Sequence, residues 1–423
     1  MASDSMTETA PDAADSDVIT FDEIQAAQRR IRDAIYVSPC PESENLSERT
    51  GATVHLKMEN LQRTGSFKER GASNKLQQLD EDQRERGVIA ASAGNHAQAV
   101  AYHGTRLDIE STIVMPEGTP LVKVTRTRRF GAEVILEGSN YDEAYAHACQ
   151  LADERDLEFV HPFNDRAIIA GQGTLGLELL EQNPYIDTVV CAVGGGGLIS
   201  GMAAALKETN PEIRVVGVEP ESLPSMKTAL ERREIVEVPE GQTIADGIAV
   251  RKVGNLTYAS ASKYVDEMVT VDEQEIANAI LVLLEEEKTV AEGAGAASVA
   301  ALLADKVSDI EGEQVFPIIC GGNIDVNVIS KIIDRGLAAA GRIFRLDLQI
   351  RDVPGSLAKV LTRIGELDAN VLEVYHDRTF AESEGSQLGV TNVELKLETR
   401  GREHIERIRE TLQEDGYEIL DHL

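Results

Sequence analysis

Short apolar runs alternate with helix-like segments through most of this 423-residue chain, and this alternation narrows the fold more than any other feature. Each run has the length of a strand, and the segments that follow the first three runs are helix-like. The runs are Val88–Ala91, Ser111–Met115, Ala132–Leu136, Val189–Val193, Val215–Val218 and Val315–Ile319. Strands that alternate with helices predict parallel sheets covered by helices, here as two α/β lobes with a cleft between them.

The pattern changes around Arg342. From there to the end, strand-like and helix-like segments follow the order βαββαβ, which predicts a ferredoxin-like α+β unit over residues 342–423. Residues 1–17 are polar and acidic and are predicted to be a disordered tail. The length agrees with several domains, and residues 18–341 are left for the α/β lobes.

Four motifs in the α/β part carry candidate chemistry. Lys68 stands in a turn with glycine on both sides, where loss of hydration lowers the pKa of an amine and fits it for Schiff-base chemistry. Gly194–Leu198 lies between a strand-like and a helix-like run, so its N–H groups can converge on an anion. Ser92–His96 and Cys320–Asn323 are small-residue turns. Alone, each motif has an ordinary alternative. Lys68 could be an exposed lysine, the glycine run a nucleotide-binding or flexible loop, and the Asn95 turn a helix cap.

In their order along the chain, Lys68, Ser92–His96, Gly194–Leu198 and Cys320–Asn323, the four motifs resemble the fold type II pyridoxal phosphate (PLP) enzymes, and most closely the threonine ammonia-lyase (threonine dehydratase) family. The resemblance extends from about Phe21 to about Gly341. It implies a tryptophan synthase β-like architecture in which the smaller lobe, at about 54–148, is inserted in the larger. It also implies PLP as the cofactor and L-threonine as the substrate, which is deaminated to 2-oxobutanoate and ammonia.

The resemblance also implies roles for individual residues. Lys68 would hold the cofactor aldehyde and act as the base, Phe67 would pack on the cofactor ring, and Asn95 would bond the ring oxygen. The residues expected to hold the phosphate are Gly194, Gly195, Gly196, Gly197 and Leu198. Those expected near the ring are Gly247, Glu292 and Cys320, and those expected at the substrate carboxylate are Ser92, Ala93, Gly94, Asn95 and His96. Segments His161–Asn164, Gly171–Thr174, Ala245–Gly247 and Glu292–Gly295 are expected to line the cleft.

Four positions help to choose among related reactions. Cys320 matches the position that faces the ring nitrogen, where many relatives carry serine. A thiol is a weak donor that does not force ring protonation, which favours β-elimination over transamination. Ala93 stands where racemases of this fold carry a second acid/base hydroxyl, so racemisation is disfavoured. Glu219 matches one carboxylate of a racemase-type metal site, but Ser225 stands in place of a second, and we predict no metal.

Other readings stay open at this point. Serine dehydratase and serine racemase are alternatives on the same fold, and side activity on serine is expected because one methyl group is a weak basis for discrimination. The hypothesis of an NAD-dependent oxidoreductase is weakened because the glycine run has no G-x-G-x-x-G spacing. A catalytically inactive amino-acid sensor is disfavoured by the intact Lys68 and Asn95.

The C-terminal unit carries Asp-x-Pro-Gly-x-Leu at Asp352–Leu357 and resembles the ACT domain, a small-molecule sensor. The alternative is a dimerisation module without a ligand. If it senses an amino acid such as isoleucine or valine, allosteric control of isoleucine biosynthesis is one expectation. Asp352, Gly355 and Asn370 would then face the effector across a subunit interface, in a homo-oligomer such as a dimer or tetramer.

Charge and cysteine usage bound the environment. A net charge of −32 argues against nucleic acid as a partner, since a phosphate backbone would be repelled. The acidic, lysine-poor composition favours the interpretation that the protein is adapted to a salt-rich, halophilic cytoplasm over the interpretation that it is an ordinary acidic protein. The four cysteines, Cys40, Cys149, Cys191 and Cys320, are far apart in sequence, which predicts a reducing, cytoplasmic location. No apolar run approaches the roughly 20 residues of a membrane span.

Overall fold

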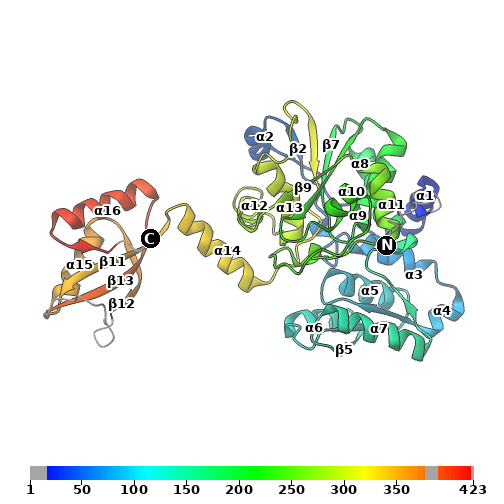
Figure 1. Ribbon diagram of the computed structural model, residues 1–423, viewed down its shortest axis with the longest axis horizontal. Coiled ribbons are helices and arrows are strands. Elements are labelled where there is room, and N and C mark those ends of the chain that lie inside the picture. Colours follow the sequence, from blue (N-terminus) through cyan, green and yellow to red (C-terminus); the bar gives the residue numbers. More distant parts are fainter. Residues whose placement is uncertain (1–16, 377–388, 421–423) are drawn as a thin grey trace, which may run out of the picture. The chain divides into compact units, whose positions relative to one another are not determined.

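The computed structural model describes residues 17–376 and 389–420. They divide into two compact units between Ile324 and Asp325, whereas the predicted domain boundary lay after residue 341. Helix α14 (Val326–Ala339) therefore goes with the second unit. Apart from Asp17, the predicted acidic tail lies outside the described residues. Figure 1 shows the elements of each unit.

The larger sheet of the first unit has six strands in the order β1-β2-β10-β7-β8-β9, and all neighbours are parallel except β1 and β2. Its strands are β1 (Glu42–Ser43), β2 (Thr53–His55), β7 (Thr188–Ala192), β8 (Arg214–Pro220), β9 (Glu267–Val271) and β10 (Gln314–Pro317). The helices of this lobe are α1 (Phe21–Ile31), α2 (Glu44–Thr50), α8 (Arg166–Gln182), α9 (Gly197–Thr209), α10 (Ser225–Arg232), α11 (Asn255–Tyr264), α12 (Glu273–Glu285) and α13 (Gly293–Leu303), with 3-10 turns η2 (Glu59–Leu61) and η3 (Asp246–Ile248).

The smaller sheet has four parallel strands in the order β5-β4-β3-β6. They are β3 (Val88–Ala91), β4 (Ser111–Met115), β5 (Glu133–Leu136) and β6 (Glu158–Phe159). The helices that connect or precede them are α3 (Lys68–Gln77), α4 (Glu81–Arg86), α5 (Asn95–Arg106), α6 (Leu121–Arg129) and α7 (Tyr141–Arg155), and in Figure 1 α5, α6, α7 and β5 gather in one lobe. This sheet ends later than the range 54–148 expected for the smaller lobe, and β2 belongs to the larger sheet.

Burial explains why these segments form parallel sheets. Every residue of β3, β4 and β7 is buried, as expected for strands that are covered by helices on both faces. Helices α5 and α9 begin just after the carboxyl ends of β3 and β7. Ligands of open α/β sheets bind at this edge, so the fold places Ser92–His96 and Gly194–Leu198 where a ligand is expected.

The second unit contains α14 followed by β11 (Ile343–Arg351), α15 (Ser356–Glu366), β12 (Asn370–Tyr375), β13 (Val390–Glu398), α16 (Arg402–Glu414) and β14 (Glu418–Ile419). The strands form an antiparallel sheet in the order β12-β13-β11-β14. The βαββαβ order and the α/β lobes confirm the predicted fold class. None of the described helices is long and apolar enough to span a membrane.

Candidate active site

Lys68 is the first residue of α3, whereas the sequence placed it in a turn before the helix. Its Nζ donates to the carbonyl oxygen of Pro162 at 2.8 Å and lies 5.1 Å from the centre of the Phe67 ring. Burial lowers the pKa of Lys68 from 10.5 to about 8, although the nearby Cys320 and Glu292 act in the opposite direction. The amine therefore points into the protein and loses its proton far more readily than an ordinary lysine.

Segment Pro162–Phe163, which accepts the hydrogen bond from Lys68, also packs against the glycine run. Phe163, next to the carbonyl that accepts from Lys68, packs its ring against Gly195, where a Cβ atom would collide with it. Gly196 has a φ of +87°, and a Cβ there would meet Met226 at 2.5 Å. Glycine is needed for this close approach and for this conformation. The structure thus brings Lys68 and the glycine run into contact with the same short segment, Pro162–Phe163.

The glycine run presents unpaired donors at a helix start. Within residues 17–376 and 389–420, no hydrogen bond of the structure uses the N–H groups of Gly194–Leu198, and no side chain caps α9. N–H groups at a helix N-terminus form a binding site for anions such as phosphate. The residues present therefore fit the phosphate of the cofactor predicted from the sequence.

A chain of side-chain amides crosses from the smaller lobe to the larger. Asn95, the first residue of α5, donates from Nδ2 to Glu292 Oε1 at 2.6 Å and accepts at Oδ1 from Asn323 Nδ2 at 2.8 Å. Asn323 Nδ2 also donates to the carbonyl oxygen of Thr64 at 2.6 Å. Asn95 is thus held from both sides, close to the turn that precedes Lys68.

Two buried groups flank this chain. Burial, together with the charge of Asp246, raises the pKa of Glu292 to about 7. Burial and the charge of Glu292 raise the pKa of the Cys320 thiol well above its usual value, so it keeps its proton. The predicted ring-side residues therefore lie together, since Gly247 also faces Glu292 and Lys68 is electrostatically coupled to both acids. Their roles toward a ring remain predictions.

The start of α5 offers a second set of donors. No side chain caps α5, and the N–H groups of Asn95, His96 and Ala97 have no acceptor among the hydrogen bonds found in the described part of the chain. Ser92 Oγ accepts from the N–H of Gly94 at 3.1 Å, while Ala93 carries no polar group. His96 differs from the prediction in one respect: its buried ring donates to the carbonyl oxygen of Val160, so only its backbone is placed to meet a carboxylate. Burial lowers the pKa of His96 to about 3.

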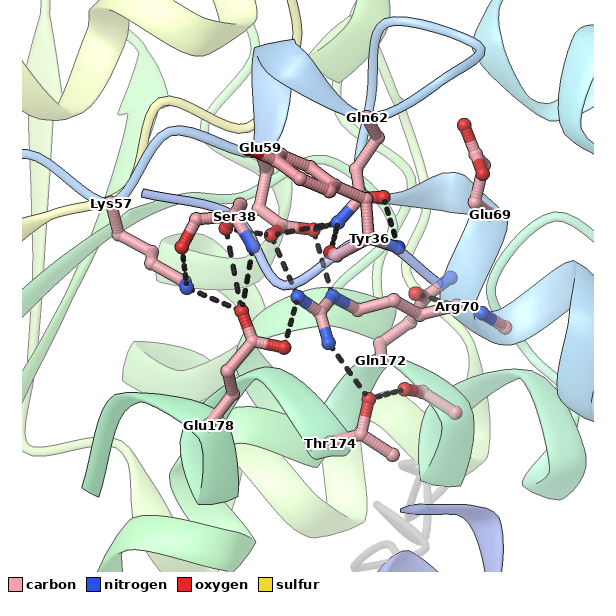
Figure 2. Close-up of polar contacts among 12 residues, drawn as sticks. Tyr36, Ser38, Lys57, Glu59, Gln62, Glu69, Arg70, Gln172, Thr174 and Glu178 are labelled. Atoms are coloured by element: carbon pink, nitrogen blue, oxygen red, sulfur yellow. Dashed lines mark hydrogen bonds and ion pairs between the residues drawn. The ribbon is translucent and has the colours of Figure 1, made fainter. Parts of the chain in front are cut away.

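A buried charge network, which no sequence pattern indicated, anchors the helix of Lys68 (Figure 2). Arg70, two residues after Lys68, makes a bidentate ion pair with Glu59, with both N–O distances at 2.8 Å, and a further bond to Glu178 of α8 at 2.9 Å. Lys57 donates to the other oxygen of Glu178. The side chains of Lys57, Glu59 and Arg70 are at most 2% exposed. Burial alone would raise the pKa of Glu59, but Arg70 and Lys57 outweigh it and lower the pKa.

Glycines bring α3 and α8 into backbone contact beside this network. A Cβ atom on Gly171 would lie 2.6 Å from the carbonyl oxygen of Arg70, and one on Gly71 would meet Gln172. Segment Gly171–Thr174, which the resemblance places in the cleft lining, is buried in α8 and packs against α3, and Thr174 accepts from Arg70 at 3.3 Å. Helix packing at this separation requires glycine on both sides.

Glu219 is occupied within the fold. Its carboxylate accepts from the backbone N–H groups of Met226 and Lys227 at 2.7 and 2.8 Å and from Ser225 Oγ at 3.3 Å, and so caps α10. Burial raises the pKa of Glu219 to about 7. Among the residues that the structure describes, no group of three His, Cys, Asp or Glu side chains is arranged to hold a metal ion.

The predicted effector residues separate within one chain. Asp352 and Gly355 follow the end of β11, where Arg351 pairs with Val390. Asn370 opposes Glu398, which also pairs with Ile343 at the beginning of β11. Asp352 and Gly355 therefore lie at one end of the sheet and Asn370 at the other.

Comparison with known proteins agrees with this geometry. Residues 31–321 match the family model described as "Pyridoxal-phosphate dependent enzyme", so the chain belongs to this family. Over 402 residues it is 50% identical to L-threonine ammonia-lyase of Thermotoga maritima, covering 95% of this chain and 99% of the relative. The chain is also similar to the structure of threonine deaminase isoform 2 from Solanum lycopersicum, with a TM-score of 0.71 and 37% identity over 77% of this chain and 95% of that one. The maize serine racemase structure has a TM-score of 0.72 and 34% identity over 76% and 99%.

The lowered pKa of Lys68 leads to a prediction about cofactor uptake. Only the neutral amine attacks an aldehyde, and Lys68 is mostly protonated below pH 8 and mostly neutral above it. We expect the rate at which cofactor-free protein takes up PLP to rise by about tenfold per pH unit below pH 8 and to level off above it. Stopped-flow absorbance between pH 6 and 10 measures this rate. A rise that continues to pH 10 would indicate an ordinary, solvated lysine and contradict the assignment.

Proposed function

We propose that this protein is a PLP-dependent threonine ammonia-lyase that converts L-threonine to 2-oxobutanoate and ammonia. The observation that carries the proposal is the inward-pointing amine of Lys68, with its lowered pKa, beside an unpaired bed of glycine N–H groups. It occurs in a chain that is 50% identical over almost its whole length to an L-threonine ammonia-lyase. The family to which the chain belongs identifies PLP as the cofactor.

The bound cofactor supplies an electron sink that makes the Cα–H bond of an attached amino acid acidic. Lys68 is the proposed base: its Nζ removes the Cα proton, and the pKa of about 8 keeps a useful fraction of the amine neutral near neutral pH. Gly194–Leu198 are proposed to hold the phosphate. Loss of the β-hydroxyl as water and later uptake of one water by the released enamine balance the conversion to 2-oxobutanoate and ammonia.

The substrate carboxylate is proposed to lie at the N-terminus of α5, where the backbone N–H groups of Asn95 and His96 and the Ser92 hydroxyl are available. A negative charge is stabilised there by the helix dipole and by direct hydrogen bonds. Asn95 is proposed to contact the cofactor oxygen, because its amide is held on both sides by Glu292 and Asn323. Phe67, Gly247, Glu292 and Cys320 are proposed to surround the ring.

Serine racemase is the second candidate because the chain is also similar to a racemase structure. Racemisation needs a second group that can transfer a proton on the face opposite Lys68. The methyl group of Ala93 cannot do so. Glu219, which matches a carboxylate of the racemase-type metal site, is engaged in capping α10. These two features favour elimination.

The second unit is proposed to be an ACT-like regulatory domain that binds an amino acid such as isoleucine or valine. Its βαββαβ order supports this proposal. Asp352 and Gly355 can share an effector with Asn370 only if two copies of the chain supply opposite ends of their sheets. A homo-oligomer is therefore part of the proposal.

One set of assays tests these proposals: turnover of L-threonine, L-serine and D-serine by the purified protein, with and without isoleucine or valine. We expect L-threonine to be deaminated and L-serine to react about 10 to 200-fold more slowly in kcat/KM, the range that one methyl group supports. Interconversion of L- and D-serine that outpaces deamination would favour the racemase instead. Unchanged threonine kinetics with both amino acids would reject the effector proposal and leave the lyase standing.

A further inference from the structure

Helix α6 carries two cations that reach from the smaller lobe to the larger. Its buried residues are Val124, which packs in the core of its own lobe, and Thr127. Beside them, Lys123 Nζ lies 2.7 Å from Asp246 Oδ2 of η3, and Arg126 Nη1 donates to Asn323 Oδ1 at 3.1 Å. Since positions three residues apart lie on one face of a helix, the two side chains form a pair of ties across the cleft.

The two ties differ in what they reach. Lys123 forms an ion pair with an exposed carboxylate, and an exposed ion pair contributes little to stability. Arg126 bonds Asn323, whose amide is already committed to Thr64 and Asn95. A guanidinium offers only donors, so it selects the carbonyl oxygen of Asn323 and directs the NH₂ group toward Asn95. Together with the Thr64 carbonyl oxygen, Arg126 therefore fixes the orientation of Asn323.

This orientation passes on to Asn95. With its Oδ1 accepting from Asn323, Asn95 must turn its own NH₂ group toward Glu292. A rotated Asn323 amide would place two oxygens opposite each other and weaken the hold on Asn95. The series Arg126, Asn323, Asn95 and Glu292 alternates donor and acceptor without a break.

We propose that Arg126 is a positioning residue, which acts through Asn323 to hold Asn95 in the orientation used for cofactor binding and ties α6 to the larger lobe. The inference rests on the proposed function, because that proposal assigns Asn95 to the cofactor. Arg126 itself touches neither cofactor nor substrate in this scheme.

Four variants and one double variant test the proposal: Arg126→Gln, Arg126→Lys, Asn323→Ala, the exposed control Arg129→Gln on the same helix, and Arg126→Gln with Asn323→Ala. The readouts are the dissociation constant for PLP from absorbance titration and hydrogen exchange of α6 in the cofactor-free protein. We expect Arg126→Gln to weaken PLP binding about tenfold, the effect of one charged hydrogen bond at a half-exposed site. Arg126→Lys should restore part of the affinity, and Arg129→Gln should leave it within about twofold of wild type.

The double variant should bind PLP no more weakly than Asn323→Ala alone, since effects that act through one residue are not additive. Faster exchange in α6 should accompany Arg126→Gln but not Arg129→Gln. Wild-type affinity and exchange in Arg126→Gln, or losses that multiply in the double variant, would overturn the proposal. If wild type binds PLP but leaves threonine unchanged, the proposed function fails while the binding data still decide the role of Arg126. If wild type binds no PLP, the exchange comparison still decides whether Arg126 ties the lobes.

Discussion

Replacing Lys68 by alanine is expected to abolish turnover of L-threonine, with a loss on the order of 10⁴-fold or more, since the variant lacks the proposed base. The yellow colour of the purified protein, which borohydride should bleach in wild type, should be absent as well. Both effects follow from one amine, whose Nζ is held 2.8 Å from the Pro162 carbonyl oxygen in the structure. Absorbance spectra and a 2-oxobutanoate assay measure them.

The matched control is Lys75→Ala, in the last turn of the same helix. Lys75 forms ion pairs with Glu158 and Asp165 at 2.9 Å, away from the proposed site, so its loss should leave colour and turnover close to wild type. A Lys68→Ala protein that stays yellow and active would refute the proposed role of this residue. Loss of activity in both variants would instead point to damage to α3.

The second large effect is expected at Glu59. Replacing it by glutamine keeps the shape but leaves Arg70 and Lys57 with only Glu178 to balance two buried positive charges. Breaking one partner of a buried ion pair costs about 3–5 kcal/mol of unfolding free energy. Guanidinium unfolding of the cofactor-free protein, followed by circular dichroism, measures the loss without a contribution from ligand binding.

The control for this prediction is Arg155→Gln, which breaks the exposed ion pair with Glu133. Exposed pairs contribute about 1 kcal/mol or less, so this variant should unfold almost as wild type does. Equal losses in Glu59→Gln and Arg155→Gln would show that burial of the network adds no stability. Because Arg70 lies two residues from Lys68, a loosened network should also weaken PLP binding.

Sequence reasoning recovered the elements whose pattern is local. The apolar runs of β3 and β4 were predicted at their observed residues, because a buried strand is encoded in neighbouring positions. The βαββαβ order of the second unit was predicted for the same reason. The Gly194–Leu198 loop was also located, since a glycine run between a strand and a helix is visible in one line of sequence.

What the sequence left out depends on partners far apart in the chain. Arg70 is separated in sequence by 108 residues from Glu178 and by 11 from Glu59. No local pattern marks either glutamate as buried. The tie from Arg126 to Asn323 spans 197 residues. For Gly171–Thr174, the resemblance implied a place in the cleft lining, and the close packing of this segment against α3 was not predicted. Lys68 was predicted to lie in a turn because glycine stands close before it, whereas α3 already begins at Lys68.

The backbone contact of α3 and α8 at Gly71 and Gly171 has a consequence for how such enzymes diversify. It joins the amine that is proposed to transfer the proton to the body that carries the proposed phosphate loop, whereas the turn before α5, which is proposed to bind the carboxylate, follows a strand of the other sheet. Mutations in Ser92–His96 can thus alter which amino acid is accepted, or which of two related outcomes it meets, while the amine stays in register with the glycine loop. Selection can act on specificity without first dismantling reactivity.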